Sequence, residues 1–477
     1  MYRSFRAFER FVSVLIPNRK RHLRLTENMT SETMPNMAQQ GRFFHNVKWQ
    51  LVGSISQASL GALLLTITAK QFGVAGYGVM SIVLGYVAVA NLLLEPRIQD
   101  VAAKEFWNLN QEDSPLVQYK QYIIDLFIVE VLCKFLVCLG LIVLAPMLAK
   151  IGNLSSDSAL LIIIAATGAF LTKIGSGLSV GILRVLGRLD LHTYCTGGEL
   201  VFRLIVTLAF INFGTLSVLT YVIVFSVSGI VSNAIIWIFV VKQFDEIASS
   251  LKAWEPSAAV QRIRKKRNLI LVNIGLSASD LMNRDLDVTL MSPMLSSDQV
   301  GLYKMAKNIA MLSWRAVDPF YTAILPELSR LVAIRHYPAI RRLILRIFIG
   351  LLILSLFASL VSYTLIVVYG DAILGNAFSN AQKLLPWMFV GVIIGASLIW
   401  GHPLVVALNR PDISLKGSLL GSIFGLAVFF NLTNSYGAIG SSIAWSLTLV
   451  ITFAFTASAS CYLLREQERV NCMNNLK

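Results

Sequence analysis

The chain has 477 residues, of which 56% are hydrophobic and only 14% are charged, and its mean hydropathy is +0.67. Soluble domains carry roughly 25% charged residues, so the composition excludes an ordinary soluble fold. The formal charge of +15 arises from Lys and Arg between apolar runs, which indicates membrane topology and no nucleic-acid partner. The 5 cysteines show no CxxC spacing, so we predict neither a disulfide framework nor a metal site.

Residues 1–45 are predicted to form a basic cytoplasmic N-terminal extension. Their apolar run, residues 11–17, is too short for the core of a signal peptide. Apolar residues at positions 5, 8, 12 and 15 recur at helical spacing opposite three arginines, which is typical of a short helix on an anionic leaflet. A disordered basic tail is the alternative for this segment.

The remaining sequence predicts an all-α polytopic membrane protein with about twelve transmembrane helices. Apolar stretches of about 18 to 25 residues recur, and such stretches cross a hydrocarbon core of roughly 30 Å. The predicted spans are 49–69, 77–95, 122–146, 158–183, 198–214, 217–241, 269–291, 300–324, 345–369, 384–408, 413–431 and 437–464. They form an N-terminal six-helix lobe (46–241) and a C-terminal six-helix lobe (269–464), with a basic cytoplasmic linker (242–268) and a cytoplasmic tail (465–477).

Lys and Arg are distributed unequally over the two sides of this predicted bundle. The predicted inner segments hold 30 of them, and the outer loops hold only Lys70, Lys150 and Lys383. Because positive residues collect in cytoplasmic loops, both termini are predicted to lie in the cytoplasm.

The two halves of the sequence resemble each other at a shift of 223 residues. This shift places Gly78 on Gly301 and Glu95 on Asp318, and a proline follows each of the two acids. The third and fourth spans fall on the ninth and tenth, whereas the last two pairs need a shift nearer 220. Since six spans per half make the repeats parallel, a central cavity between two parallel lobes is predicted.

Eight basic residues lie inside predicted spans, where each costs roughly 2.5 to 3.5 kcal/mol at the bilayer centre, so they must face protein, water or a ligand. They are Lys134, Lys173, Arg203, Arg284, Lys304, Lys307, Arg315 and Lys416. Lys304 and Lys416 lie near predicted span ends, from which a lysine can reach the interface, and are discounted. Within the seventh span, one predicted helical face carries Asn273, Ser277, Asp280, Arg284 and Asp287.

Arginine suits a phosphate or diphosphate because its planar fork donates two parallel hydrogen bonds and stays protonated. We therefore predict that Arg284 and Arg315 bind an anionic head group. Lys307 is predicted to support them, with Arg203 and Lys173 on the opposite wall.

Charge neutralisation inside the membrane is the alternative role for these cations. Helical spacing allows Glu130 to pair with Lys134 and Glu199 to pair with Arg203. Arg284 could likewise pair with an acid on its own helical face.

Four acids are candidates for binding H⁺ or Na⁺ and coupling an ion gradient to transport. They are Asp280, Asp285, Asp287 and Asp318, of which Asp318 is also a candidate partner of Arg315. The sequence leaves ion coupling and simple charge balance open.

The sequence predicts a protein that is not an enzyme. It contains neither the GxxxxGK[ST] phosphate loop nor the HExxH zinc motif. The longest predicted outer loop, about residues 370–383, has no histidine and a single acid, Asp371, so it offers no catalytic groups on that side.

Three stretches resemble bacterial polysaccharide-unit flippases of the Wzx type. They are AKQFGVAGYGVMSIVLGYVAVANLLLEPRIQDVAAKEF, GILRVLGRLDLHTYCTGGELVFRL and RDLDVTLMSPMLSSDQVGLYKMAKNIAMLSWRAVDPFYTAILPELSRL. The resemblance runs from about Asn46 to Leu464, and VGLY followed by LPELSRL is its sharpest part. That family belongs to the superfamily of multidrug, oligosaccharidyl-lipid and polysaccharide exporters, which also holds MATE drug exporters and lipid II flippases. Since the basic extension departs from the family pattern, translation is expected to begin at Met34 or Met37.

The resemblance implies a MATE-like two-lobed bundle that flips an oligosaccharide linked to undecaprenyl diphosphate across the bacterial inner membrane by alternating access. It implies no covalent chemistry and no cofactor, with H⁺ or Na⁺ coupling left open. The implied partners are the lipid-linked oligosaccharide, membrane lipids and other assembly proteins of O-antigen, lipopolysaccharide or exopolysaccharide biosynthesis. A cation-coupled multidrug exporter of the same fold and a membrane glycan polymerase or ligase are the alternatives.

Overall fold

The computed structural model describes most of the chain beyond its first 35 residues. The described residues are 36–102, 116–185, 188–243, 256–279, 281, 284–315, 317, 324, 328–329, 331–332, 334–410 and 412–475. Residues Met1–His45 and Asn46–Lys477 are separate units, and the described part of the first, residues 36–45, is helical. Within the described residues, all regular structure is helical.

The first two predicted spans lie in one helical element, α2 (Asn36–Leu93), which is broken at Gly73. A straight helix of this length would measure about 87 Å, nearly three times the thickness of the hydrocarbon core. Gly73 has a φ of 65°, a conformation that glycine adopts without steric cost, so the chain turns between two crossings there.

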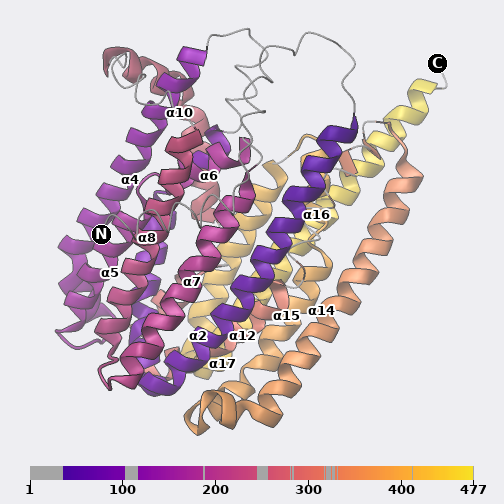
Figure 1. Cartoon of the computed structure of the whole chain (residues 1–477). Coiled ribbons are helices and arrows are strands. Elements are labelled where there is room, and N and C mark those ends of the chain that lie inside the picture. Colours follow the sequence, from indigo (N-terminus) through magenta and orange to yellow (C-terminus); the bar gives the residue numbers. More distant parts are fainter. Residues whose placement is uncertain are drawn as a thin grey trace. The chain divides into compact units, whose positions relative to one another are not determined.

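Five further helices complete the first half of the chain (Figure 1). They are α4 (Leu116–Ile151), α5 (Ser158–Lys173), α6 (Ser176–Val185), α7 (Leu189–Asn212) and α8 (Val218–Gln243). The second half contains α10 (Pro256–Ser279), α11 (Leu286–Met291), α12 (Ser297–Arg315), α14 (Tyr337–Leu374), the 3-10 helix η2 (Asn376–Lys383), α15 (Leu385–Ser397), α16 (Gly401–Ala407) and α17 (Asp412–Asn475). Of these described elements, α17 contains a break at Gly437 and therefore provides two crossings.

The helices of the second half repeat those of the first at a shift of 223 residues. Shifted by this amount, α4 ends where α14 ends, and the break between α5 and α6 falls on the break between α15 and α16. Gly214 falls on Gly437, and both have positive φ values, 67° and 60°. The shift of 223 therefore holds through the last two pairs, and the predicted change to about 220 is wrong.

An Arg-x-Asp ion pair stands at the start of the fifth crossing in each half. Arg188 Nε lies 3.2 Å from the Asp190 carboxylate before and within α7, and Arg410 Nε lies 3.0 Å from that of Asp412 at the start of α17. We call the end that carries Arg97, Arg188 and Arg410 the basic end, and the end that carries Gly73, Gly214 and Gly437 the opposite end.

The two halves meet near the opposite end at a pair of repeat-related glycines, Gly78 and Gly301. A Cβ at Gly78 would lie 1.9 Å from the carbonyl oxygen of Ser297, and a Cβ at Gly301 would lie 2.3 Å from that of Val74. Val74 and Ser297 are themselves 223 residues apart, so the contact is symmetric. We call it the glycine crossing. It shows that the axis relating the two parallel halves passes between α2 and α12.

The seventh predicted span differs from the structure at both ends. Its helix, α10, begins at Pro256, within the predicted linker 242–268, and ends at Ser279. Arg262 of α10 donates to Asp125 of α4 at 2.6 Å and 3.1 Å, which fixes the start of α10 to the first half. After Ser279, helical structure resumes at Leu286 in α11, so the described part of the span is two helices and not one.

Eight stretches of the described chain are long and apolar enough to cross a membrane. Two of them, Ser56–Ala102 and Asp412–Arg469, contain the glycine breaks and provide two crossings each. With α10 and α12, which carry the intramembrane charges, the described helices account for the twelve predicted spans. Large apolar side chains such as Ile353 and Phe357 are exposed on α14, as expected of a surface that faces lipid.

Candidate functional site

A cavity of about 1000 Å³ lies between the two halves of the bundle. Its walls come from both parts of α2, from α5 to α8, and from α10, residues 284–285 and α12. On α12 the lining begins at Lys304, just after the glycine crossing, and on the α2 side it extends to Asp100 at the basic end. The cavity therefore runs from the glycine crossing toward the basic end.

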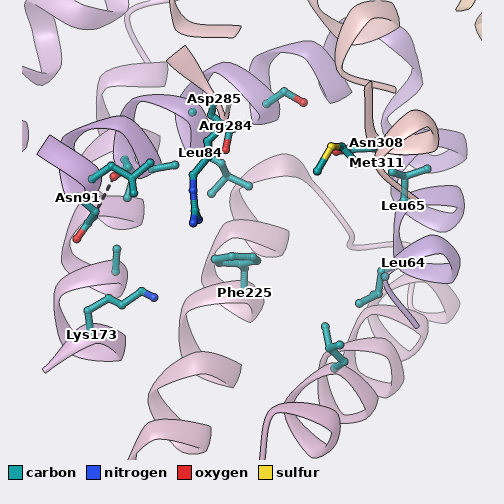
Figure 2. Close-up of a pocket in the computed structure, with 18 of the residues that line it drawn as sticks. Leu64, Leu65, Leu84, Asn91, Lys173, Phe225, Arg284, Asp285, Asn308 and Met311 are labelled. Atoms are coloured by element: carbon teal, nitrogen blue, oxygen red, sulfur yellow. Dashed lines mark hydrogen bonds between the residues drawn. The ribbon is translucent and has the colours of Figure 1, made fainter. Parts of the chain in front are cut away.

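The cavity is polar on one side and apolar on the other. Figure 2 shows Arg284 reaching into the middle of the pocket, with Asn91 and Lys173 on one side of it. Leu64 and Met311 lie on the other side. The cavity can therefore hold an amphiphilic molecule with its charged part near Arg284.

Cations outnumber acids among the described residues that line the cavity. The basic residues are Arg97, Lys173, Arg203, Arg284, Lys304 and Arg315, and the acidic residues are Glu95, Asp100 and Asp285. Charges interact more strongly in a site walled by protein than in bulk water. The cavity is therefore electrostatically suited to an anion.

Three of these cations are exposed to the cavity, and no described carboxylate forms an ion pair with them. They are Lys173 at the end of α5, Arg284 after α10 and Arg315 at the end of α12. Arg315 reaches across to α2, where its Nη1 lies 3.8 Å from the position of a Cβ at Gly61. An anion can contact these three side chains without first displacing a described acid.

Arg203 lies in the same wall as Lys173, but its charge is already neutralised. The guanidinium pairs with Glu199, one turn earlier on α7, and donates to the Ser228 hydroxyl at 3.0 Å. It also stacks on Phe225 at 4.0 Å from the ring centroid, a favourable cation–π contact. The predicted alternative of charge pairing thus describes the contacts of Arg203, whereas its predicted binding role remains a prediction.

Lys307 and Asp287 do not line the cavity with Arg284, which corrects the predicted polar face of the seventh span. Both side chains are buried, and the Lys307 ammonium lies 2.6 Å from the Asp287 carboxylate. The physical reason is the interruption between Ser279 and Leu286, which removes the regular helical spacing that the prediction assumed.

Lys304 was discounted from sequence because it lies near a predicted span end, and this was wrong. It lines the cavity and pairs with Asp285, another cavity residue. Asp285 is therefore neutralised by a neighbouring lysine. The other two coupling candidates, Asp280 and Asp318, lie outside the described residues.

Lys134 pairs with Glu95 of α2, and not with Glu130 one turn earlier on α4 as predicted. Glu130 instead accepts the backbone N–H groups of Gly177 and Leu178, at 2.7 Å and 3.0 Å. The first turn of a helix leaves such N–H groups without intrahelical partners, and α6 begins at Ser176. The break between α5 and α6 thus draws Glu130 away from Lys134.

The residues that sequence analysis missed come from the end of the second span. Asn91, Glu95, Arg97 and Asp100 all line the cavity. Asn91 and Glu95 are four residues apart at the end of an otherwise apolar helix, which is a helical-face signal. Arg97 and Asp100 gave no such signal, because they read as ordinary loop charges.

The pentapeptide GLSVG, residues 177–181, matches the GxSxG pattern of serine hydrolases. In those enzymes the serine stands on a turn between a strand and a helix. Here Ser179 is fully buried within α6, and its hydroxyl donates to the Ser176 carbonyl at 2.9 Å. The match is therefore structural. Among the described residues, no three His, Cys, Asp or Glu side chains cluster as metal ligands.

A sequence model of the family described as "Polysaccharide biosynthesis protein" matches residues 43–332, which is more than half of the 477 residues. The chain belongs to this family. The match includes both glycines of the crossing and all the described cavity residues. No curated protein matches the chain by sequence.

Solved transporter structures share the fold of this polysaccharide biosynthesis protein. An inward-facing multidrug resistance MATE family transporter of the MOP superfamily aligns with a TM-score of 0.64 at 12% identity, covering 89% of this chain and 96% of that one. The MATE transporter VcmN of Vibrio cholerae in its bent form aligns with a TM-score of 0.55 at 16% identity, covering 90% and 98%. The lipid II flippase MurJ in an inward closed conformation aligns with a TM-score of 0.55 at 13% identity, covering 89% and 87%. The predicted two-lobed, MATE-like bundle is thereby confirmed.

Cysteine labelling tests whether the cavity holds water in a membrane. With the 5 native cysteines replaced by serine, cysteines at Lys173 and Arg284 are expected to react with a water-soluble methanethiosulfonate reagent. A cysteine at Ile353, on the lipid-facing surface of α14, is the control and should stay unlabelled because thiolates do not form in lipid. Protection of both cavity positions from reagent on either side of the membrane would contradict a wet cavity.

Proposed function

We propose that this polysaccharide biosynthesis protein is a flippase for an oligosaccharide linked to undecaprenyl diphosphate. It moves the substrate from the inner to the outer leaflet of the bacterial inner membrane, and it does no covalent chemistry. The proposal rests above all on Lys173, Arg284 and Arg315, the cavity cations without a described carboxylate partner. The family match supports a role in polysaccharide assembly.

A diphosphate fits this set of side chains better than a neutral sugar does. Each arginine can donate two parallel hydrogen bonds to phosphate oxygens, and the lysine can add a point charge. Buried cations without anionic partners are costly in a membrane, so an anionic ligand would offset that cost. The apolar lining around Leu64 and Met311 suits the less polar parts of the same amphiphile.

The basic end is proposed to face the cytoplasm, with both termini on that side. The cavity runs toward this end, and the glycine crossing lies between the cavity and the opposite end. In this arrangement the cavity receives its substrate from the inner leaflet. Release to the outer leaflet requires that α2 and α12 separate at the glycine crossing while the basic ends of the two halves close, which is alternating access between parallel repeats.

A multidrug exporter with the same fold is a weaker proposal for this chain. A cationic drug would need an excess of acids, whereas the described lining residues have an excess of cations. Of the three lining acids, Glu95, Asp100 and Asp285 each already pair with a basic side chain. No described lining acid is thus left to attract a cationic drug.

The direct test replaces Arg284 and Arg315 by alanine, singly and together, and measures glycan in the outer leaflet of cells lacking the unmodified protein. Each loss of a hydrogen-bonded charge contact is worth about 1.5 to 3 kcal/mol, so export should fall by roughly tenfold or more per substitution. Arg341→Ala is the matched control, because Arg341 is exposed and pairs with Glu468 outside the cavity. Export by Arg341→Ala should be unchanged.

Unchanged export in the double variant, with normal insertion in the membrane, would refute the proposal. The test also separates a flippase from a glycan polymerase. Loss of a flippase strands single repeat units on the inner leaflet, whereas loss of a polymerase leaves single units exported.

A further inference from the structure

Arg284 sits in the interruption between α10 and α11. Helix α10 ends at Ser279, and helical structure resumes at Leu286. A helix end leaves carbonyl groups without intrahelical partners, and a segment that is not helical has no regular ladder to fix its conformation. Other contacts must therefore hold the segment in the conformation that directs Arg284 into the cavity.

Lys307 of α12 provides such a contact from the core. Its ammonium group donates to the backbone carbonyl of Arg284 and, at 2.6 Å, to the carboxylate of Asp287. It also lies 5.4 Å from the ring centroid of Trp445 on α17. One buried lysine thus joins the segment that carries Arg284 to α11, α12 and α17.

Asp287 is fully engaged by the groups around it. It has 0% exposure and accepts hydrogen bonds from Lys307, from the Tyr303 hydroxyl and, at 2.8 Å, from the backbone N–H of Val288. A buried ion pair contributes little net stability, but it enforces a geometry when its hydrogen bonds are all made. The Asp287–Lys307 pair is therefore suited to fixing a conformation.

A second lysine on α12, one turn earlier, contacts the same segment on its cavity side. Lys304 pairs with Asp285, the residue directly after Arg284. Lysines three residues apart on one helix face thus bind aspartates two residues apart, one in the cavity and one in the core. The segment is held from both sides.

We propose that Lys307 and Asp287 are positioning residues that hold Arg284 in the cavity for an anionic head group. The inference rests on the proposed function, and it replaces the prediction that Lys307 and Asp287 themselves bind substrate or a coupling ion. Lys307 acts through the backbone of Arg284, so its removal should weaken anion binding only while Arg284 is present.

A double-mutant cycle with inorganic diphosphate as the probe tests this dependence. Binding to the purified full-length protein in detergent is measured for the unmodified protein, Arg284→Ala, Lys307→Met/Asp287→Asn and the triple variant. The double variant removes both charges, so no unpaired charge is left in the core, and Asp287→Asn alone serves as the conservative variant that keeps the side-chain shape. Arg341→Met/Glu468→Gln is the control for removing an ion pair outside the cavity.

Lys307→Met/Asp287→Asn is expected to weaken diphosphate binding about tenfold, close to the effect of Arg284→Ala, as for one lost hydrogen bond to a charged group. Asp287→Asn alone should weaken it in the same direction. In the triple variant the loss should be no larger than in Arg284→Ala alone, because coupled residues are not additive. The control pair should leave binding unchanged.

The same loss in the presence and absence of Arg284 would overturn the positioning role, and so would unchanged binding in both Lys307→Met/Asp287→Asn and Asp287→Asn. In either case the proposed function stands if Arg284→Ala weakens binding. Absence of diphosphate binding by the unmodified protein would overturn both proposals.

Discussion

Alanine at Gly301 or at Gly78 is expected to stop transport by forcing the two halves of the bundle apart at the opposite end. The added Cβ would lie 2.3 Å from the Val74 carbonyl oxygen in the first case and 1.9 Å from the Ser297 carbonyl oxygen in the second. Both neighbours are backbone atoms, so a side-chain rotation cannot relieve the overlap. Overpacking of this kind costs about 1 to 3 kcal/mol, a shift of roughly 5- to 150-fold between closed and open forms.

Labelling of a cysteine at Met311, inside the cavity, measures the shift. Reagent added at the opposite end should label it faster in Gly78→Ala and Gly301→Ala than in the parent, while export of glycan falls. Gly275→Ala is the control, since no neighbouring heavy atom lies within 4 Å of its added Cβ, and alanine favours the helix by about 1 kcal/mol. Normal export by Gly301→Ala and Gly78→Ala would mean that the glycine crossing is not a closed gate.

The fold could be predicted in some detail because lipid imposes strict rules on sequence. Span lengths, the even number of spans per half and the pairing of Gly78 with Gly301 all followed from hydropathy and a repeat search. The sequence did not show that Gly214 and Gly437 are equivalent. Hydropathy places the ends of spans to within several residues only, and a glycine with positive φ leaves no hydropathy signal.

The candidate site was predictable where a charge lies in a regular helix, and less so where the helix is interrupted. Lys173 and Arg203 stand on α5 and α7, and both line the cavity as expected of intramembrane charges. Arg284 does too, but Asp287 does not, because the chain between Ser279 and Leu286 departs from the helical spacing on which the prediction depended. Ion-pair partners were the least predictable feature, since Lys134 has a nearer acid in sequence than Glu95.

The Lys134–Glu95 pair is expected to show a strong asymmetry between its two single substitutions. The Lys134 side chain is 1% exposed, whereas that of Glu95 is 25% exposed, toward the cavity. Glu95→Gln would leave a buried ammonium group with only a long hydrogen bond, 3.4 Å, to the Asn91 carbonyl, and breaking a buried pair in this way costs about 3 to 5 kcal/mol. Lys134→Met would leave a carboxylate that cavity water can solvate, so the loss should be smaller.

Thermal unfolding of the purified protein in detergent measures this asymmetry. Glu95→Gln should lower the midpoint most, Lys134→Met should lower it less, and the double variant should recover part of the Glu95→Gln loss because no buried charge remains unpaired. Arg184→Met serves as the control, because its pair with Asp100 is exposed on both sides and exposed pairs contribute at most about 1 kcal/mol. If the double variant unfolds at a temperature as low as Glu95→Gln does, the cost comes from lost packing around residue 95 and not from an unpaired Lys134.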